Sequence, residues 1–210
     1  MNGRGIFITG TDTGVGKTWV TTRLIQKLRA SGIDAVGMKP VECGGQEDSL
    51  AIFKASGGDE AGLTLEMVNP FSLPEPLAPA AATISRPIDF PVIRAAFNDL
   101  ADRHEFVIVE GAGGWLVPLD HERTMADLAV ALALPVILVA ANRLGVLNHS
   151  LLTIRAIRES GLVCRGLFLN QPDPTPDLSA RTNHAILQKM LPEIAILGMD
   201  LDGLVDLSLE

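Results

Sequence analysis

Residues 10 to 18 have the composition of a loop that binds phosphate groups. They read GTDTGVGKT and lie between an apolar run that predicts a strand and a pattern that predicts a helix. Glycines let the backbone approach an anion without a Cβ clash, and the free N–H groups at the start of a helix attract negative charge. We expect Lys17 to contact the β- and γ-phosphates of a nucleoside triphosphate, and the hydroxyl of Thr18 to reach a Mg²⁺ ion.

The loop departs from the strict spacing of this motif at one position. The usual first glycine would stand at Thr11, and Gly10 lies one residue too early. The alternative is a glycine-rich turn that carries a lysine and a threonine by chance, but the strand, the glycines and both of these residues together favour a phosphate site. The residues predicted to contact the nucleotide here are Asp12, Thr13, Gly14, Val15, Gly16, Lys17, Thr18 and Trp19.

Two acidic residues are candidates to hold the metal ion that accompanies a triphosphate. Glu110 ends the apolar stretch FVIVE and is followed by a glycine-rich run, residues 111–114, and the alternative to a metal contact is a solvated glutamate at a strand end with a flexible loop after it. In an open sheet of parallel strands, ligands bind at the carboxyl ends of the strands. Asp48 opens a predicted helix and is either a further oxygen ligand beside Thr18 and Glu110 or an ordinary first-turn acid that the helix dipole favours.

A second lysine stands at the end of the next predicted strand. Lys39 is followed by Pro40, which restricts the residue before it to extended backbone geometry. A lysine at the tip of a buried strand beside a phosphate loop is unfavourable unless it meets an anion. We therefore predict that Lys39 is a second cation near the γ-phosphate or the reacting group. The alternative is a lysine that reaches solvent along its aliphatic stem.

The order of the predicted elements indicates how these side chains are positioned. Strand-like runs alternate with helical patterns, which is typical of an α/β fold, here a P-loop NTPase-like parallel sheet with helices on both faces. The predicted strands are Gly5–Thr9, Ala35–Pro40, Phe106–Glu110, Val136–Ala140, Gly166–Asn170 and Ile194–Met199. The predicted helices are Lys17–Ala30, Glu47–Ser56, Pro91–Arg103, Met125–Leu132, Leu147–Ser160 and Asp177–Met190. Residues 57–87 are rich in proline and also apolar, and we expect them to form a packed insertion near the active-site edge of the sheet.

The composition limits the classes of protein to which the chain can belong. Of 210 residues, 47% are hydrophobic and 20% are charged, which argues against a disordered chain and suits one domain over residues 1–210. The net charge of −8 argues against nucleic acid or an anionic membrane as the main partner. The longest apolar run, residues 128–141, is too short to span a bilayer. The start of the chain has no leader pattern, and Cys43 and Cys164 have no metal-ligand spacing, so we expect a cytoplasmic protein.

These motifs together resemble the dethiobiotin synthetase family, and they run in family order across most of the chain. The matching stretches are GTDTGVGKT (10–18), KPV (39–41), Asp48, VNPF (68–71), RPI (86–88), VEGAGGWLVPL (109–119), LPVILV (134–139), RLGVLNHSLLT (143–153) and LNQ (169–171). The combination of GTDT-x-VGKT with VEGAGG is specific to this family or its close relatives.

The resemblance implies a homodimeric enzyme that converts 7,8-diaminononanoate, CO₂ and ATP into dethiobiotin, ADP and phosphate. One amine would first form a carbamate, ATP would phosphorylate that carbamate, and the second amine would attack the activated carbon and close the ring. Such chemistry needs cations around growing negative charge and close positioning of the two amines, and its first steps need no nucleophilic side chain.

The resemblance also assigns roles to individual residues. Lys17 and Lys39 would be the catalytic lysines, and Mg²⁺ would contact Thr18, Asp48 and Glu110. The residues implied to contact ATP beyond the loop are Asp48, Glu110, Gly111, Ala112, Gly113, Asn170, which would read the adenine edge, and Gln171. The residues implied to contact the diamino acid are Thr13, Lys39, Cys43, Gly113, and, from the neighbouring subunit, Gly145 and Asn148. The family often has serine at the position of Cys43, and a thiol is a weaker hydrogen-bond donor.

Besides a small-molecule kinase, which would release a stable phosphorylated product, two other functions are alternatives. The first is a switch or partitioning ATPase, but such proteins depend on a second lysine where this chain has Asp12. The second is another ATP-dependent small-molecule ligase, such as the enzymes that amidate cobyrinate, which usually carry a glutamine-hydrolysing domain that 210 residues cannot accommodate.

Overall fold

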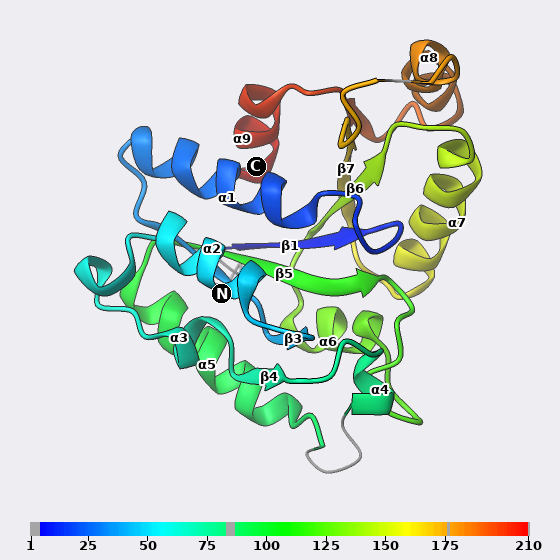
Figure 1. Ribbon diagram of the computed structural model, residues 1–210. Helices are drawn as coiled ribbons and strands as arrows, with labels where there is room; N and C mark the ends of the chain where they lie inside the picture. The colour runs from blue at the N-terminus through cyan, green and yellow to red at the C-terminus, as the bar shows by residue number, and fades with distance from the viewer. Residues whose placement is uncertain (1–4, 83–86, 176, 210) are drawn as a thin grey trace.

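The computed structural model describes residues 5–82, 87–175 and 177–209, and these residues build a six-stranded sheet (Figure 1). The strand order is β2-β5-β1-β6-β7-β8, and every neighbouring pair is parallel. The strands are β1 (Gly5–Gly10), β2 (Ala35–Met38), β5 (Phe106–Gly114), β6 (Val136–Ala141), β7 (Cys164–Asn170) and β8 (Ala195–Leu197). All six residues of β1 are buried, as expected for a strand that is covered on both faces.

Helices cover both faces of the sheet, which confirms the predicted α/β fold class. One face carries α1, α2 and α9, and the other carries α5, α6 and α7 (Figure 1). The helices of the described residues are α1 (Lys17–Ala30), α2 (Glu47–Ala55), α3 (Leu65–Val68), α4 (Pro79–Ala82), α5 (Phe90–Arg103), α6 (Met125–Leu132), α7 (Val146–Glu159), α8 (Ala180–Met190) and α9 (Leu201–Leu209), with the 3₁₀ helix η1 (Gly58–Ala61). None of these is long and apolar enough to cross a membrane.

A second, two-stranded sheet branches from the end of β2. It pairs β3 (Val41–Cys43) with β4 (Phe71–Leu73) in parallel. The predicted strand over Ala35–Pro40 is therefore too long, because β2 ends at Met38 and the backbone N–H of Lys39 donates to the Val68 carbonyl at 2.8 Å. Sequence analysis missed this sheet because three-residue strands show no readable alternation.

The proline-rich stretch, residues 57–87, is a packed insertion over the residues that the structure describes. It contains η1, α3, β4 and α4, and the N–H of Ala80 donates to the carbonyl of Pro118 at 3.1 Å. Residues 83–86, which include Arg86 of the RPI motif, lie outside the described residues. The insertion supplies one wall of the site described below.

Several other predicted boundaries are wrong by two to four residues, and three helices of the described residues, α3, α4 and α9, were missed. β5 continues four residues beyond Glu110, to Gly114, and the helix predicted from Asp177 begins at Ala180. The Asp177 carboxylate accepts N–H bonds from Ala180 and Leu144, so it caps the helix from outside. α9 was not predicted, and its Leu207 fills the space above Gly166 of β7. The buried face of α9 is defined by its contact with β7, which lies far from α9 in the chain.

Gly37 in β2 tests how tightly one helical layer packs on the sheet. A Cβ at this position would lie 2.4 Å from Ile52 Cγ2 of α2 and 2.7 Å from Ile25 Cδ1 of α1. We predict that Gly37→Ala lowers the free energy of unfolding by about 1–3 kcal/mol, because extra volume in a packed core forces its neighbours to move. Urea denaturation measures this, with Gly198→Ala as control, since no atom lies within 4 Å of the Cβ there. Equal losses in both variants would contradict close packing at Gly37.

Candidate active site

The loop between β1 and α1 has the backbone geometry that an anion needs. Gly14 and Gly16 have φ angles of 73° and 92°, values that residues with a Cβ rarely adopt. α1 begins at Lys17, and no side chain caps its first turn. The free N–H groups of that turn are therefore available to a phosphate. Val15 is buried between the two glycines and anchors the loop to the core.

Lys17 lies beneath this loop and is 6% exposed. Its Nζ donates to the carbonyl of Asp12 at 3.0 Å, and the Asp12 carboxylate accepts the N–H of Thr13 at 2.7 Å. Burial, followed by repulsion from Lys39, lowers the pKa of Lys17 to about 8. The loop thus holds a lysine whose positive charge lacks a full counter-ion and favours the arrival of an anion.

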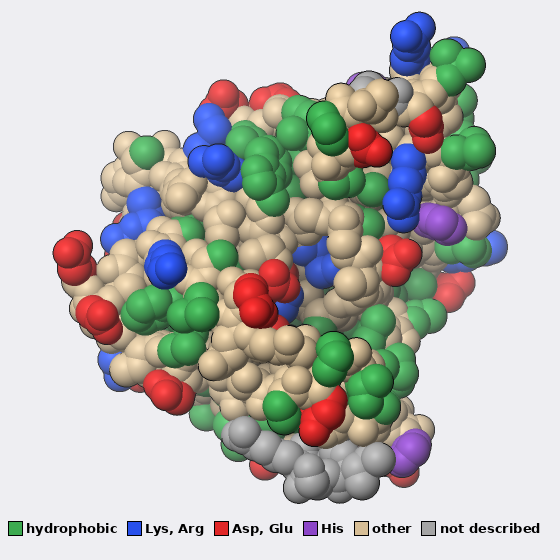
Figure 2. Space-filling view, viewed as in Figure 1, with side chains coloured by type: hydrophobic (Ala, Val, Ile, Leu, Met, Phe, Trp, Pro, Cys, Tyr) green, Lys and Arg blue, Asp and Glu red, His purple; other side chains and the backbone are tan. Residues whose placement is uncertain are grey.

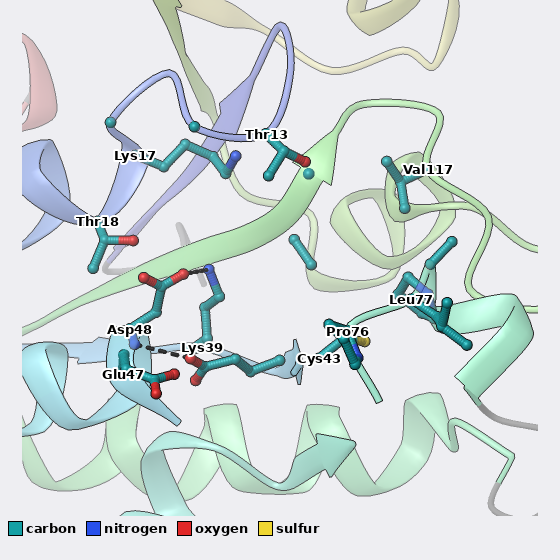
Figure 3. A pocket seen from close by; sticks show the side chains of 17 residues that line it. Thr13, Lys17, Thr18, Lys39, Cys43, Glu47, Asp48, Pro76, Leu77 and Val117 are labelled. Atoms are coloured by element: carbon teal, nitrogen blue, oxygen red, sulfur yellow. Dashed lines mark hydrogen bonds and ion pairs between the residues drawn. The ribbon is translucent and has the colours of Figure 1, made fainter. Parts of the chain in front are cut away.

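A buried network of charges lies beside the loop at the carboxyl end of β5. Lys39 Nζ donates to Glu110 Oε1 at 2.6 Å and to Asp48 Oδ2 at 2.8 Å, and the Thr18 hydroxyl donates to Glu110 Oε1 at 2.8 Å. Lys39 is 3% exposed and Glu110 is fully buried. The alternative that the Lys39 side chain reaches solvent is therefore wrong, whereas its role near a γ-phosphate or reacting group stays a prediction. Figure 3 shows Lys39 and Asp48 pointing toward one another.

The network shifts the titration of its members. Burial by itself would lower the pKa of Lys39, but the Glu110 and Asp48 carboxylates raise it above its usual range. Burial would raise the pKa of Asp48, but the charge and hydrogen bond of Lys39, with help from Thr18, lower it. At neutral pH the lysine is therefore an ammonium group and Asp48 a carboxylate.

The oxygen atoms of this network suit a hard cation. Glu110 Oε2 is buried and makes no hydrogen bond to any described residue, while Thr18 and Asp48 place further oxygens beside the same carboxyl group. No cluster of three or more His, Cys, Asp or Glu ligands occurs among the residues that the structure describes. Mg²⁺ is commonly held by one or two carboxylates together with waters and substrate phosphates, so two carboxylates and a hydroxyl fit it.

A cavity of about 790 Å³ opens between the loop and the proline-rich insertion. Charged side chains line one side, and Pro76, Leu77 and Val117 line the other, as Figure 3 shows. The full lining is Thr13, Gly14, Gly16, Lys17, Thr18, Lys39, Glu42, Cys43, Glu47, Asp48, Pro76, Leu77, Ala78, Pro79, Ala112, Gly113 and Val117. In the space-filling view, acidic and basic side chains meet near the centre of this face (Figure 2).

Comparison with known proteins identifies the family. A family model described as an AAA domain matches residues 4–199. The chain is 46% identical over 193 residues to the ATP-dependent dethiobiotin synthetase BioD of Anaeromyxobacter dehalogenans, with 89% of this chain and 85% of that protein covered. It is 39% identical to the ATP-dependent dethiobiotin synthetase BioD of Akkermansia muciniphila, with 97% and 98% covered. The chain belongs to the dethiobiotin synthetase family.

Solved structures agree on the fold of this family member. The chloroplast FtsY of Physcomitrella patens superposes with a TM-score of 0.55 at 14% identity, covering 99% of this chain and 65% of that one. At this identity the likeness shows the shared P-loop fold alone.

The structure places several of the predicted contact residues in the cavity of this synthetase-family chain and others outside it. Thr13, Cys43, Ala112 and Gly113 join the two lysines there, although they come from three separate segments of the chain. The predicted residues that do not line the cavity are Asp12, Val15, Trp19, Glu110, Gly111, Asn170, Gln171, Gly145 and Asn148. Glu110 is connected to the site through its hydrogen bonds with Thr18 and Lys39, which both line the cavity.

Two of these residues have surroundings that bear on their predicted roles. Asn170, at the end of β7, donates its side-chain N–H to the carbonyl of Val15 at 2.8 Å, so it braces the phosphate loop from behind. A Cβ on Gly16 would collide with this amide at 2.0 Å. Gly145 precedes α7 with a φ angle of 96° and lies on an exposed part of the surface beside Leu144. Their contacts with adenine and with a substrate carboxylate stay predictions.

Sequence analysis missed two residues that hold the charge network in place. Asn69 donates its side-chain N–H to the Lys39 carbonyl at 2.7 Å, and Glu42 accepts backbone N–H groups from Asp48 and Ser49. Both are buried. Asn69 lies within the VNPF stretch, so the motif held a signal, whereas Glu42 carried none because its partners depend on where α2 packs.

The buried Lys39–Glu110 pair provides a stability test. We predict that Lys39→Met lowers the free energy of unfolding by about 3 kcal/mol or more, because Glu110 would keep a buried charge without its partner. The control is Lys27→Met, whose partner Asp202 is exposed and whose loss should cost about 1 kcal/mol or less. Urea unfolding at neutral pH measures both. An unchanged midpoint in Lys39→Met would mean that other groups neutralise Glu110.

Proposed function

We propose that this chain closes the ureido ring of dethiobiotin from 7,8-diaminononanoate and CO₂, with ATP converted to ADP and phosphate. The observation that carries the proposal is the convergence of Lys17 and Lys39 on one cavity beside a phosphate-type loop. The apolar wall of Pro76, Leu77 and Val117 suits an aliphatic chain such as that of the diamino acid.

The reaction needs three bond-forming steps. An amine nitrogen adds to CO₂ and loses a proton, which gives a carbamate. A carbamate oxygen then bonds to the γ-phosphorus of ATP while the bond to the ADP oxygen breaks. Finally, the second amine nitrogen bonds to the carbonyl carbon of the phosphorylated carbamate and loses a proton, while the bond from that carbon to the phosphate oxygen breaks. Inorganic phosphate leaves and the ring closes. Because both amines belong to one substrate, holding it still makes the last attack intramolecular.

The two lysines supply positive charge where negative charge grows. Lys17 lies under the loop that would hold the triphosphate, and its ammonium group would stabilise the oxygens between the β- and γ-phosphorus atoms. Lys39 lines the same cavity and would stabilise the carbamate and the transferred phosphoryl group. Its raised pKa keeps it from acting as a base at neutral pH.

Mg²⁺ is the metal that this donor set suits, and Thr18, Asp48 and Glu110 are the residues that would hold it. Bound there, the ion would neutralise phosphate charge and orient the γ-phosphoryl group. The Oε2 of Glu110, which has no partner within residues 5–82, 87–175 and 177–209, supports this placement.

The remaining elements of the proposal concern assembly. We propose a cytoplasmic homodimer in which each chain forms one ATP-binding domain. Gly145 and Asn148 lie at the start of α7, where helix N–H groups favour an anion. Because neither residue lines the cavity of its own chain, they would receive the substrate carboxylate in the partner's site.

The decisive experiment measures ADP release with each substrate omitted in turn. We expect turnover only when the diamino acid and bicarbonate are both present, with a product whose mass is that of the closed ring. Lys17→Ala should lower kcat by about 10³-fold or more, because a transition-state charge contact is removed. ATP hydrolysis that ignores both substrates would favour a switch ATPase instead. A stable phosphorylated product would indicate a kinase.

The lowered pKa of Lys17 predicts a pH dependence of nucleotide affinity. In the free protein this lysine loses its proton as the pH rises through about 8, and ATP binds best to the ammonium form. The Kd for a non-hydrolysable ATP analogue should therefore be flat below that pH and rise by up to about tenfold per pH unit above it.

Titration calorimetry between pH 6.5 and 9.5 would measure this dependence, because that range extends to both sides of the Lys17 pKa of about 8. Lys17→Arg is the matched control, because a guanidinium keeps its charge over the whole range. A rise in Kd of equal steepness in Lys17→Arg would assign the effect to another group.

A further inference from the structure

Glu42 is a buried acid that the proposed chemistry does not use. It stands in the middle of β3 and is 6% exposed, with part of its side chain facing the cavity. Its Oε1 accepts the backbone N–H of Asp48 at 2.8 Å, and its Oε2 accepts that of Ser49 at 2.9 Å. Both carboxylate oxygens are thus committed to the first turn of α2.

This contact caps α2 from outside the helix. Gln46, the residue at the N-cap position, makes no capping hydrogen bond with its side chain. Glu42 supplies the missing acceptors, and its negative charge lies at the positive end of the helix dipole. No lysine or arginine forms an ion pair with Glu42 within the described ranges 5–82, 87–175 and 177–209. The first turn of α2 is therefore the main group that balances the buried charge of Glu42.

The residue held by Glu42 is the one that reaches the charge network. The backbone N–H of Asp48 is fixed by Glu42 while its carboxylate bonds to Lys39. Asp48 is partly exposed, so packing alone does not fix its direction. Glu42 in turn is fixed by the pairing of β3 with β4, where it lies opposite Ser72. The small sheet thus sets the position of an acid that belongs to a different element.

We propose that Glu42 is a positioning residue that acts through Asp48 and sets the affinity of the site for Mg²⁺ bound with nucleotide. This inference rests on the proposed function only in taking Asp48 as a metal contact. Outer partners that orient metal ligands typically change metal affinity by about 10- to 100-fold when they are removed. Both carboxylate oxygens of Glu42 bond to the backbone of α2, so an effect that runs through Asp48 should vanish when the Asp48 carboxylate is absent.

The test measures the Kd of a non-hydrolysable ATP analogue with Mg²⁺ and with EDTA, in wild type and in variants. The ratio of the two Kd values reports the contribution of the metal. We expect Glu42→Ala to reduce this ratio by about tenfold while the Kd in EDTA stays within twofold. Glu42→Gln, which keeps one carbonyl acceptor, should recover part of the ratio. Glu66→Gln is the matched control, because it removes an exposed acid in the first turn of α3 and should leave the ratio unchanged.

A double-mutant cycle separates positioning from a general structural role. In an Asp48→Asn background, Glu42→Ala should change the ratio by less than twofold, because the group through which it acts is gone. A full tenfold effect in that background would overturn the proposal, and so would an unchanged ratio in Glu42→Ala alone. An equal rise of the Kd for the ATP analogue in Mg²⁺ and in EDTA would also overturn the proposal, since that pattern indicates that Glu42 only stabilises the helix.

Two possible results need separate interpretation: failure of Glu42→Ala to fold, and absence of turnover in the wild type. If Glu42→Ala does not fold, the same cycle with Glu42→Gln decides the proposal through its smaller but measurable ratio change. If wild type shows a Mg²⁺-dependent Kd but no turnover with the diamino acid, the proposed function fails while the role of Glu42 is still decided by the binding ratios.

Discussion

The buried pairing of Lys39 with Glu110 is the constraint on which the rest of the site depends. Removing an ammonium and a carboxylate from water costs several kcal/mol per ion unless each finds good partners. Here Glu110 gains two donors from Lys39 and Thr18, and Lys39 gains a second acceptor in Asp48. The arrangement satisfies the charges and still leaves Glu110 Oε2 without a partner among the described residues. A site built in this way favours the entry of a cation and an anion together.

The elements around this pair hold it from several directions. β5 carries Glu110 to the edge of the sheet, and α1 brings Thr18 there from the phosphate loop. The short sheet of β3 and β4 contributes Val41, Phe71 and Leu73 to the hydrophobic core, and residues in and beside it hold both ends of the network. Asn69 holds the carbonyl of Lys39, and Glu42 holds the start of the helix that carries Asp48. The proline-rich insertion closes the cavity opposite the charges.

Much of the fold could be predicted, since parallel strands buried on both faces and amphipathic helices leave regular patterns. Where the prediction failed, a contact between distant segments overrode the local pattern. β2 stops at Met38 because Lys39 bonds to Val68, and the helix predicted from Asp177 starts later because that carboxylate caps it. The residues of the site likewise divide into those with a local sequence pattern and those defined by contacts between distant segments. The residues of the phosphate loop are adjacent in the chain, so their spacing identified them, whereas Glu42 has no local signature.

The sequence by itself determined the phosphate loop, the alternation of the six main strands with helices, and the family, because each depends on residues that are close together or on motifs in a fixed order. Only the tertiary structure decided that Lys39, Asp48 and Glu110 share one network and that Asn170 braces Val15. Lys39 and Glu110 are 71 residues apart in the chain. They meet because β5 pairs with both β2 and β1, and strand order is set by the packing of the whole sheet.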